Sequence, residues 1–148
     1  MLLYFGCDTK SNTQKGLEKS RAFEVEAINI KTHVDNAYKS LLPDQKSKID
    51  YLNNELRIAP DSLKLNALEL LSSEWFKLDH ALIAGHYAER LAEAKNTEDA
   101  WSIAGTTFGI ALRSSKDAKN SEYCFDHSIR AFENAISLNP DNPDNKIN

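Results

Sequence analysis

The side chains that most often carry chemistry are present in this chain, but their spacing fits no known reaction. None of the four histidines belongs to an H-E-x-x-H motif or to another i, i+4 pair that could bind a metal. Two of them directly follow an aspartate, but adjacent residues on a helix point in different directions. We therefore expect no catalytic residue, no metal site and no cofactor. The histidines are His33, His80, His86 and His127.

The hydroxyl and thiol groups give no stronger signal. Ser72 and Ser73 lie outside a G-x-S-x-G motif, and the sequence contains no glycine-rich phosphate loop. Cys7 and Cys124 are far apart and lack metal-binding or redox spacing. Since Cys124 adjoins an apolar stretch, we expect a buried structural thiol. The run at 141–145 resembles a calcium loop, but it lacks the glycine and the distal glutamate of such loops.

Composition narrows the classes of function further. The 148 residues are 41% hydrophobic and 27% charged, which is typical of a soluble globular domain. The net charge of −4 provides no basic surface for nucleic acid, so we expect no nucleic-acid partner. The sequence has no apolar run of about 18 residues that could span a membrane.

The first residues are similar to the end of a bacterial lipoprotein signal. An apolar run leads to Gly6-Cys7, and a polar stretch follows. The resemblance implies that residues 1–7 are the remnant of a signal, that Cys7 carries lipid, and that 8–29 is a flexible tether. The chain would then reside in the cell envelope, facing the periplasm or as an outer-membrane lipoprotein, with the lipid as its sole membrane contact. The alternative is a frayed terminus with an incidental cysteine on a cytoplasmic protein.

Helical periodicity begins at Ile30 and continues almost to the end of the chain. Leu42-Pro43 ends the first helix, and Pro43 can begin the second. We expect further helices after a cap at Asp61 or Ser62, after Asp79-His80, and after a cap at Asn96-Thr97. A polar loop is expected at 114–120 and a last helix at 121–138. No segment alternates convincingly as a strand, and 24–30 comes nearest.

The apolar positions on these helices define the expected core. Leu70 and Trp75 are expected on the buried face of the third helix, and Trp101 on that of the fifth. On the last helix, Phe125, Ile129, Phe132, Ala135 and Ile136 are expected to point inward.

Two segments carry a repeat pattern. Trp101-x2-Ala104-Gly105-x2-Phe108 is followed by Ser128-x3-Phe132-x2-Ala135-x4-Pro140. Leu68, Leu71, Ser72 and Trp75, followed by Ala84, Ala88 and Leu91, fit the same frame more weakly. Small residues in such a pattern allow two helices to approach closely. The pattern resembles the tetratricopeptide repeat, a helix–turn–helix of about 34 residues. Its form is similar to divergent repeats of Bacteroidetes-type bacteria.

The resemblance implies an all-α fold, in which antiparallel helical hairpins stack as a right-handed α-solenoid of about six helices. Within a helical domain at 30–148, we expect a capping hairpin at 30–60, a weak repeat at 65–97 and a repeat with an insertion at 98–142. The insertion is about eleven residues and falls in 113–123, as a loop or as helix extensions. Asn142-Pro143 predicts that a further helix begins at 143–148, so we expect a truncated array.

The family resemblance also implies a function. Stacked hairpins of this kind form a concave surface that binds peptides or proteins. We expect a non-enzymatic interaction scaffold that binds a protein or peptide partner. The alternatives are a regulatory module of a larger signalling protein and, less favoured, a helical protein that binds a small ligand. The first helix of each repeat would line the concave face, with Asp99, Ser102, Thr106, Gly109 and Ile110 from one repeat and Glu69, Ser73 and Phe76 from the other.

Overall fold

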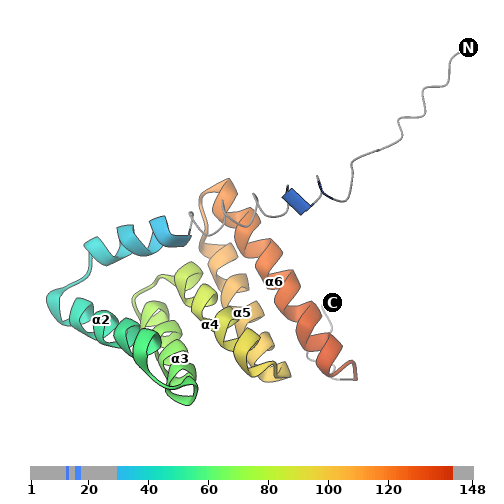
Figure 1. Ribbon diagram of the computed structural model, residues 1–148. Coiled ribbons are helices and arrows are strands. Elements are labelled where there is room, and N and C mark those ends of the chain that lie inside the picture. The colour runs from blue at the N-terminus through green and yellow to red at the C-terminus, as the bar shows by residue number, and fades with distance from the viewer. Residues whose placement is uncertain (1–12, 14–15, 18–29, 142–148) are drawn as a thin grey trace, which may run out of the picture.

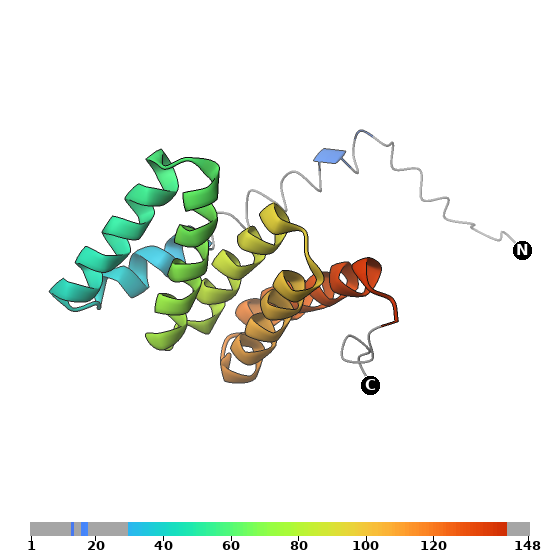
Figure 2. The same ribbon diagram turned by 90° about the horizontal axis from the view of Figure 1, so that it is seen from below.

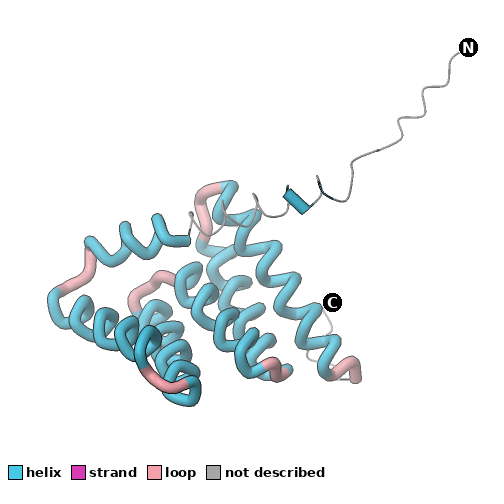
Figure 3. Tube along the Cα trace, in the orientation of Figure 1, coloured by secondary structure: helices cyan, strands magenta, loops and turns pink. Residues whose placement is uncertain are grey.

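The computed structural model describes residues 30–141, together with residues 13, 16 and 17, and this part of the chain is built of helices without a strand. Residues 30–39 form a helix that precedes the stack. Five more follow: α2 (Pro43–Ile58), α3 (Asp61–Lys77), α4 (Ala81–Lys95), α5 (Glu98–Ser114) and α6 (Ala118–Leu138). Consecutive helices from α2 to α6 pack side by side (Figure 1), and short loops join them (Figure 3). The expected all-α stack of antiparallel hairpins, with about six helices, is confirmed.

Some sequence predictions fall outside the described residues. The proposed signal remnant at 1–7, which includes Cys7, and the predicted helix start at 143–148 lie there. Of the tether expected at 8–29, three residues are described, and all three are helical and exposed. The candidate strand at 24–30 is described at Ile30 alone, which is helical. Within the described residues, none of the helices combines the length and the hydrophobicity that crossing a membrane requires.

Local chemistry sets most of the helix ends. Pro43 occupies the first turn of α2, where its missing N–H costs nothing, and the Gln45 side chain accepts a hydrogen bond from the Leu42 N–H. The Thr97 hydroxyl caps α5 by accepting a hydrogen bond from the Ala100 N–H, as the sequence predicts. Asn96 ends α4 in a left-handed conformation with φ of 47°.

Two predicted boundaries are wrong. Neither Asp61 nor Ser62 caps α3, because the helix already begins at Asp61 and Pro60 takes the cap position without a side-chain hydrogen bond. Most of the loop predicted at 114–120 is helical. Asp117 accepts a hydrogen bond from the Asn120 N–H and thereby starts α6 at Ala118, so all of 113–123 except 115–117 belongs to α5 or α6.

The prediction that Phe125 and Leu70 point into the core is also wrong. The buried face of α6 runs through Cys124, Ser128, Ala131 and Ala135, and Phe125 lies outside it with 53% of its surface exposed. Leu70 is likewise exposed, since the buried face of α3 passes through Leu68, Leu71 and Trp75. The prediction that Trp75 and Trp101 pack in the core is confirmed, as both are buried.

In each of the hairpins α3–α4 and α5–α6, a serine hydroxyl bonds to a backbone carbonyl of the other helix. In the first, the Ser72 hydroxyl donates a hydrogen bond of 2.9 Å to the Ala84 carbonyl. In the second, the Ser128 hydroxyl donates one of 2.9 Å to the Gly105 carbonyl. Each bond joins the first helix of its hairpin to the second, with the serine on the first helix in one hairpin and on the second helix in the other.

The helix at 30–39 lies across the stack (Figure 2). Ala37 joins the same core as Ile49 of α2 and Leu71 of α3. Its other side reaches α6, where His33 Nε2 lies 2.9 Å from Asn120 Oδ1. This helix therefore connects the first and last parts of the stack.

Candidate functional site

A groove of about 690 Å³ lies between α3 and α5, and α4 contributes to its lining. Phe76 comes from α3 and Ile103 from α5, and they remain 45% and 60% exposed. Leu91 of α4 contributes a buried apolar surface to the same groove. Large exposed apolar side chains that gather in a hollow are a common feature of binding surfaces.

The helices hold these side chains in place because their opposite faces are buried. The buried face of α3 passes through Leu71 and Trp75, and Phe76 is turned about 100° away from Trp75, which places it outside that face. On α5, Ala104 is buried and Ile103 beside it is exposed, because Ile103 lies outside the buried face of that helix. The exposed apolar residues therefore follow from the core register of α3 and α5.

Charged side chains surround the apolar surface of the groove. Lys95 of α4 lies 3.5 Å from Glu69 of α3, and both side chains are well exposed. Asp99 and Lys77 also contribute to the lining. Exposed ion pairs of this kind contribute little to stability, so their groups can exchange partners with a bound chain at small cost.

Five of the eight residues predicted to form the concave face line this groove. The structure brings Glu69, Ser73 and Phe76 together with Asp99 and Ile110. Ser102, Thr106 and Gly109 lie on α5 but are not part of the groove lining. A side chain at Gly109 would approach the Ser128 hydroxyl at 3.8 Å, so this position faces α6.

Sequence reasoning missed the most exposed apolar residue of the groove. Ile103 stands between buried Trp101 and Ala104, and the repeat frame assigned no role to its position. The sequence did contain a signal for this residue, because a large apolar side chain on the polar side of an amphipathic helix often marks a binding surface. The residues that α4 supplies, Leu91 and Lys95 among them, were also missed, because the frame assigns the groove to first helices alone.

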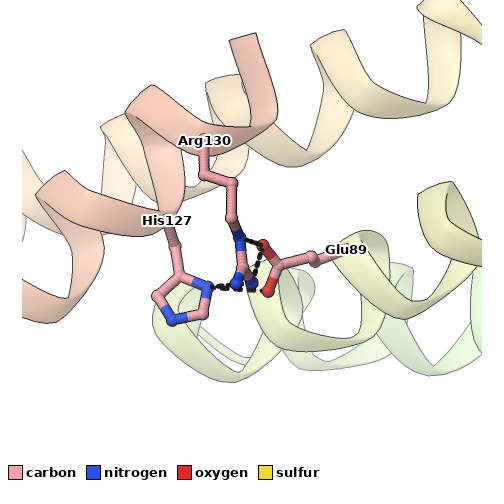
Figure 4. A network of polar contacts seen from close by, with 3 residues as sticks. All are labelled: Glu89, His127 and Arg130. Atoms are coloured by element: carbon pink, nitrogen blue, oxygen red, sulfur yellow. Dashed lines mark hydrogen bonds and ion pairs between the residues drawn. The ribbon is translucent and has the colours of Figure 1, made fainter. Parts of the chain in front are cut away.

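A second candidate feature is a buried polar network on the other side of α4. Glu89 and His127 are 4% and 6% exposed. His127 Nδ1 lies 2.7 Å from one carboxylate oxygen of Glu89, and Arg130 Nη2 donates a hydrogen bond of 2.7 Å to the other (Figure 4). Arg130 Nη2 also lies 3.1 Å from His127 Nδ1. The network joins α4 directly to α6.

Opposite charges determine the electrostatics of this network. Burial would raise the pKa of Glu89, but its hydrogen bonds and charge interactions with His127 and Arg130 lower that pKa overall. The carboxylate is therefore stabilised in its charged form. Burial, followed by the positive charge of Arg90, lowers the pKa of nearby His86 to about 4.

The surroundings of His127 favour a structural role for the network. Its ring contacts those of Tyr123 and Phe108, with centroid distances of 4.0 and 5.1 Å. A hollow of about 410 Å³ above the network is lined partly by Ile30 and Val34 of the first described helix. The arrangement braces α4 against α6 through one charge-paired carboxylate, and breaking it would leave a buried charge unpaired.

The remaining histidines and Cys124 do not assemble into a reactive group. The structure shows no cluster of three or more metal-ligating side chains within the residues it describes. Cys124 is fully buried, as expected, and burial raises the pKa of its thiol to about 11. Such a thiol is a poor nucleophile at neutral pH.

Comparison of the chain with protein-family models, with curated proteins and with solved structures found no match.

Proposed function

We propose that this chain is a non-enzymatic interaction scaffold of the tetratricopeptide type, which holds a peptide or helix of a partner protein in the groove between α3 and α5. The observation that carries the proposal is the pairing of exposed Phe76 and Ile103 in one groove of about 690 Å³. Each residue comes from the first helix of its hairpin, the helix that lines the concave surface of such repeats.

The repeat assignment is supported by corresponding contacts in the two hairpins. Ser72 and Gly105 occupy the same position in the repeat frame, and each contacts the second helix of its own hairpin at the crossing point. Trp75 and Phe108 also correspond in the frame, and both are fully buried. These correspondences favour two copies of one unit over two unrelated helical pairs.

The groove indicates the chemistry of its partner. An apolar side chain of the partner would contact Phe76 and Ile103, and charged groups on either side would pair with Glu69, Lys95 or Asp99. Completing the burial of one large apolar side chain stabilises a complex by about 1–2 kcal/mol at these exposures. We therefore propose a short amphipathic segment with a central apolar residue and flanking charges of both signs.

The test begins with selection of peptides that bind the full chain from a displayed random library. The affinity of a selected peptide is then measured by fluorescence anisotropy for the wild type, for Ile103→Glu and for Ile58→Glu. Ile58 provides a matched control because it is 62% exposed and lies at the end of α2, outside the groove lining.

We expect Ile103→Glu to weaken binding by about tenfold or more, since a charge would face the bound apolar side chain. Ile58→Glu should change affinity less than about twofold. Circular dichroism should show that both variants are as helical as the wild type. Equal affinities for the two variants would refute the assignment of the groove as the binding site.

For location, we propose attachment of the scaffold to the cell envelope through lipid on Cys7. The support for this step is the apolar run that ends in Gly6-Cys7, followed by a polar stretch. Mass spectrometry of the protein purified from its native host tests it. We expect the mass of Cys7 to include acyl chains, whereas an unmodified cysteine there would refute the proposal.

A further inference from the structure

A second apolar surface runs along α6, beside the face that packs on α5. Phe125, Ile129, Phe132 and Ile136 follow one another at intervals of one helical turn and form a stripe, which we call the α6 stripe. Phe125 is 53% exposed, and the other three side chains are half-buried. The Phe132 ring lies over Gly105 of α5, where an added Cβ would meet it at 3.0 Å, so the part of the stripe open to another helix is formed by Phe125, Ile129 and Ile136. In both views of the ribbon, α6 stands at the end of the stack with no described helix beyond it (Figures 1 and 2).

The α6 stripe has a counterpart inside the stack. The repeat frame aligns Ala84 with Ser128, and each of these residues takes part in a hydrogen bond between the two helices of its hairpin. In this alignment, on which the inference rests, each residue of the stripe corresponds to a residue of α4. In order, the corresponding residues are Ala81, Gly85, Ala88 and Ala92.

On α4, the corresponding surface is an interface with another helix. A side chain at Gly85 would come within 2.8 Å of the Phe108 ring of α5. Ala88 and Ala92 pack in one cluster with Trp101 and Ala104 of α5. The α6 stripe therefore repeats, at the same position in its hairpin, the surface on which α4 receives the next helix.

The sizes of the side chains are reversed between the two surfaces. The α4 surface is made of alanine and glycine, and it receives the large rings of Trp101 and Phe108. The α6 stripe consists of phenylalanine and isoleucine. Helices pack with their axes about 8–10 Å apart, so a helix that covers large residues must present small ones.

The charges beside the stripe place a second requirement on the helix that would cover it. Glu122, Asp126 and Glu133 are exposed on α6, and a helix with about 100° per residue places all three along the same edge of the stripe. In an antiparallel pair of two copies, the acidic edges would meet and repel each other. A helix with lysine or arginine along one edge would instead pair with them.

We propose that the α6 stripe is a docking surface for an amphipathic helix of a partner protein, with alanine, glycine or serine along its contact face and basic residues along one edge. This surface is separate from the groove between α3 and α5, so the chain would engage two partners, or two segments of one partner, at the same time.

The test uses a synthetic peptide helix with alanine at its contact positions, lysine along one edge and a fluorescent label. Two matched peptides replace either the contact alanines with leucine or the edge lysines with glutamate. Binding to the full chain is followed by fluorescence anisotropy. Sedimentation velocity, run in parallel, measures self-association of the chain.

We expect the lysine-edged alanine peptide to bind, and each matched peptide to bind at least about tenfold more weakly. The protein variant Phe125→Asp should weaken binding by a similar factor. Tyr51→Asp, which alters an exposed aromatic residue of α2, should leave the affinity within about twofold of the wild type. Ile103→Glu should do the same, which separates this surface from the groove.

Three results would overturn the proposal. The first is no binding of the lysine-edged peptide, and the second is equal affinity for the glutamate-edged one. The third is a dimer of the wild type that Phe125→Asp converts to monomer, because a second copy of the chain would then occupy the stripe. Circular dichroism of each variant verifies that a loss of binding does not reflect unfolding.

Discussion

Replacing Gly85 by alanine should destabilise the fold, although alanine is the better helix former. In an exposed helix this change gains about 1 kcal/mol. Here the new Cβ would lie 2.8, 2.9 and 3.1 Å from three carbons of the Phe108 ring. That ring is fully buried and contacts the rings of Tyr123 and His127, so it cannot move aside without disturbing them.

The expected magnitude follows from the two opposing effects. Overpacking a tight interior costs about 1–3 kcal/mol and occasionally more, and contacts under 3 Å belong at the upper end of that range. After the gain in helix propensity, we expect Gly85→Ala to lower the free energy of unfolding by about 1–2 kcal/mol. The close approach of α4 to α5 depends on this glycine, so the variant should also shift the relative position of the two hairpins.

Gly109 provides an internal control for the same substitution. A Cβ there would meet its nearest neighbour, the Ser128 hydroxyl, at 3.8 Å, which is an ordinary contact distance. Gly109→Ala should therefore raise the free energy of unfolding by up to about 1 kcal/mol.

The assay is urea unfolding followed by circular dichroism at a helical wavelength, with the transition midpoint and slope fitted together. We expect Gly85→Ala and Gly109→Ala to move the midpoint in opposite directions with unchanged slope. If Gly85→Ala proves as stable as Gly109→Ala, the tight α4–α5 contact is not present in solution, and the reasoning fails.

Three further predictions concern Glu89, His86 and Cys124. Glu89→Ala should lower the free energy of unfolding by about 2–3 kcal/mol, because His127 and half-exposed Arg130 lose their common partner, and urea unfolding measures this. Since the pKa of His86 in the fold is about 4, below its usual value of 6.5, the unfolded chain binds more protons between these two values. Stability should therefore fall as the pH drops from about 6.5 to about 4, and thermal melts of His86→Gln should show a flatter pH dependence. In a Cys7→Ser variant, the remaining thiol at Cys124 should react with a thiol reagent at pH 8 only after denaturant is added, and rapid labelling of the native protein would contradict its burial.

Much of the fold could be predicted because its determinants are local. Helical periodicity, Pro43 and the Thr97 cap each act within a few residues of the chain. The start of α6 could not be placed so well, because the polar residues 114–120 are compatible with either a loop or a helix. Asp117 decides between them by capping a helix, and its neighbours give no sign of that choice.

Phe125 shows why apolar residues cannot all be assigned to a core from sequence. The pattern on α6 contains two apolar faces, one made of small residues that pack on α5 and one made of larger residues beside it. On the second face Phe125 is exposed, whereas the half-buried Phe132 ring lies against Gly105 of α5. Hydrophobicity alone favours the larger residues. The structure buries the smaller ones, because alanines allow α5 and α6 to approach closely.

The candidate site could be predicted only in part. The repeat frame placed Phe76 and Ile110 in the groove, but it gave no role to Ile103. The network of Glu89 with His127 and Arg130 joins residues about 40 positions apart in sequence. No spacing within one helix reveals such a pair, because it depends on how α4 and α6 are packed.

The central claim is that the groove between α3 and α5 holds a partner. Backbone amide chemical shifts, recorded by NMR with and without a selected peptide, test this claim most directly. We predict that the largest changes will cluster at residues lining the groove, with Ser73, Phe76, Ile103 and Thr107 among them. Changes centred instead on the hollow beside His86 and Arg130, or spread evenly over the helices, would contradict the claim.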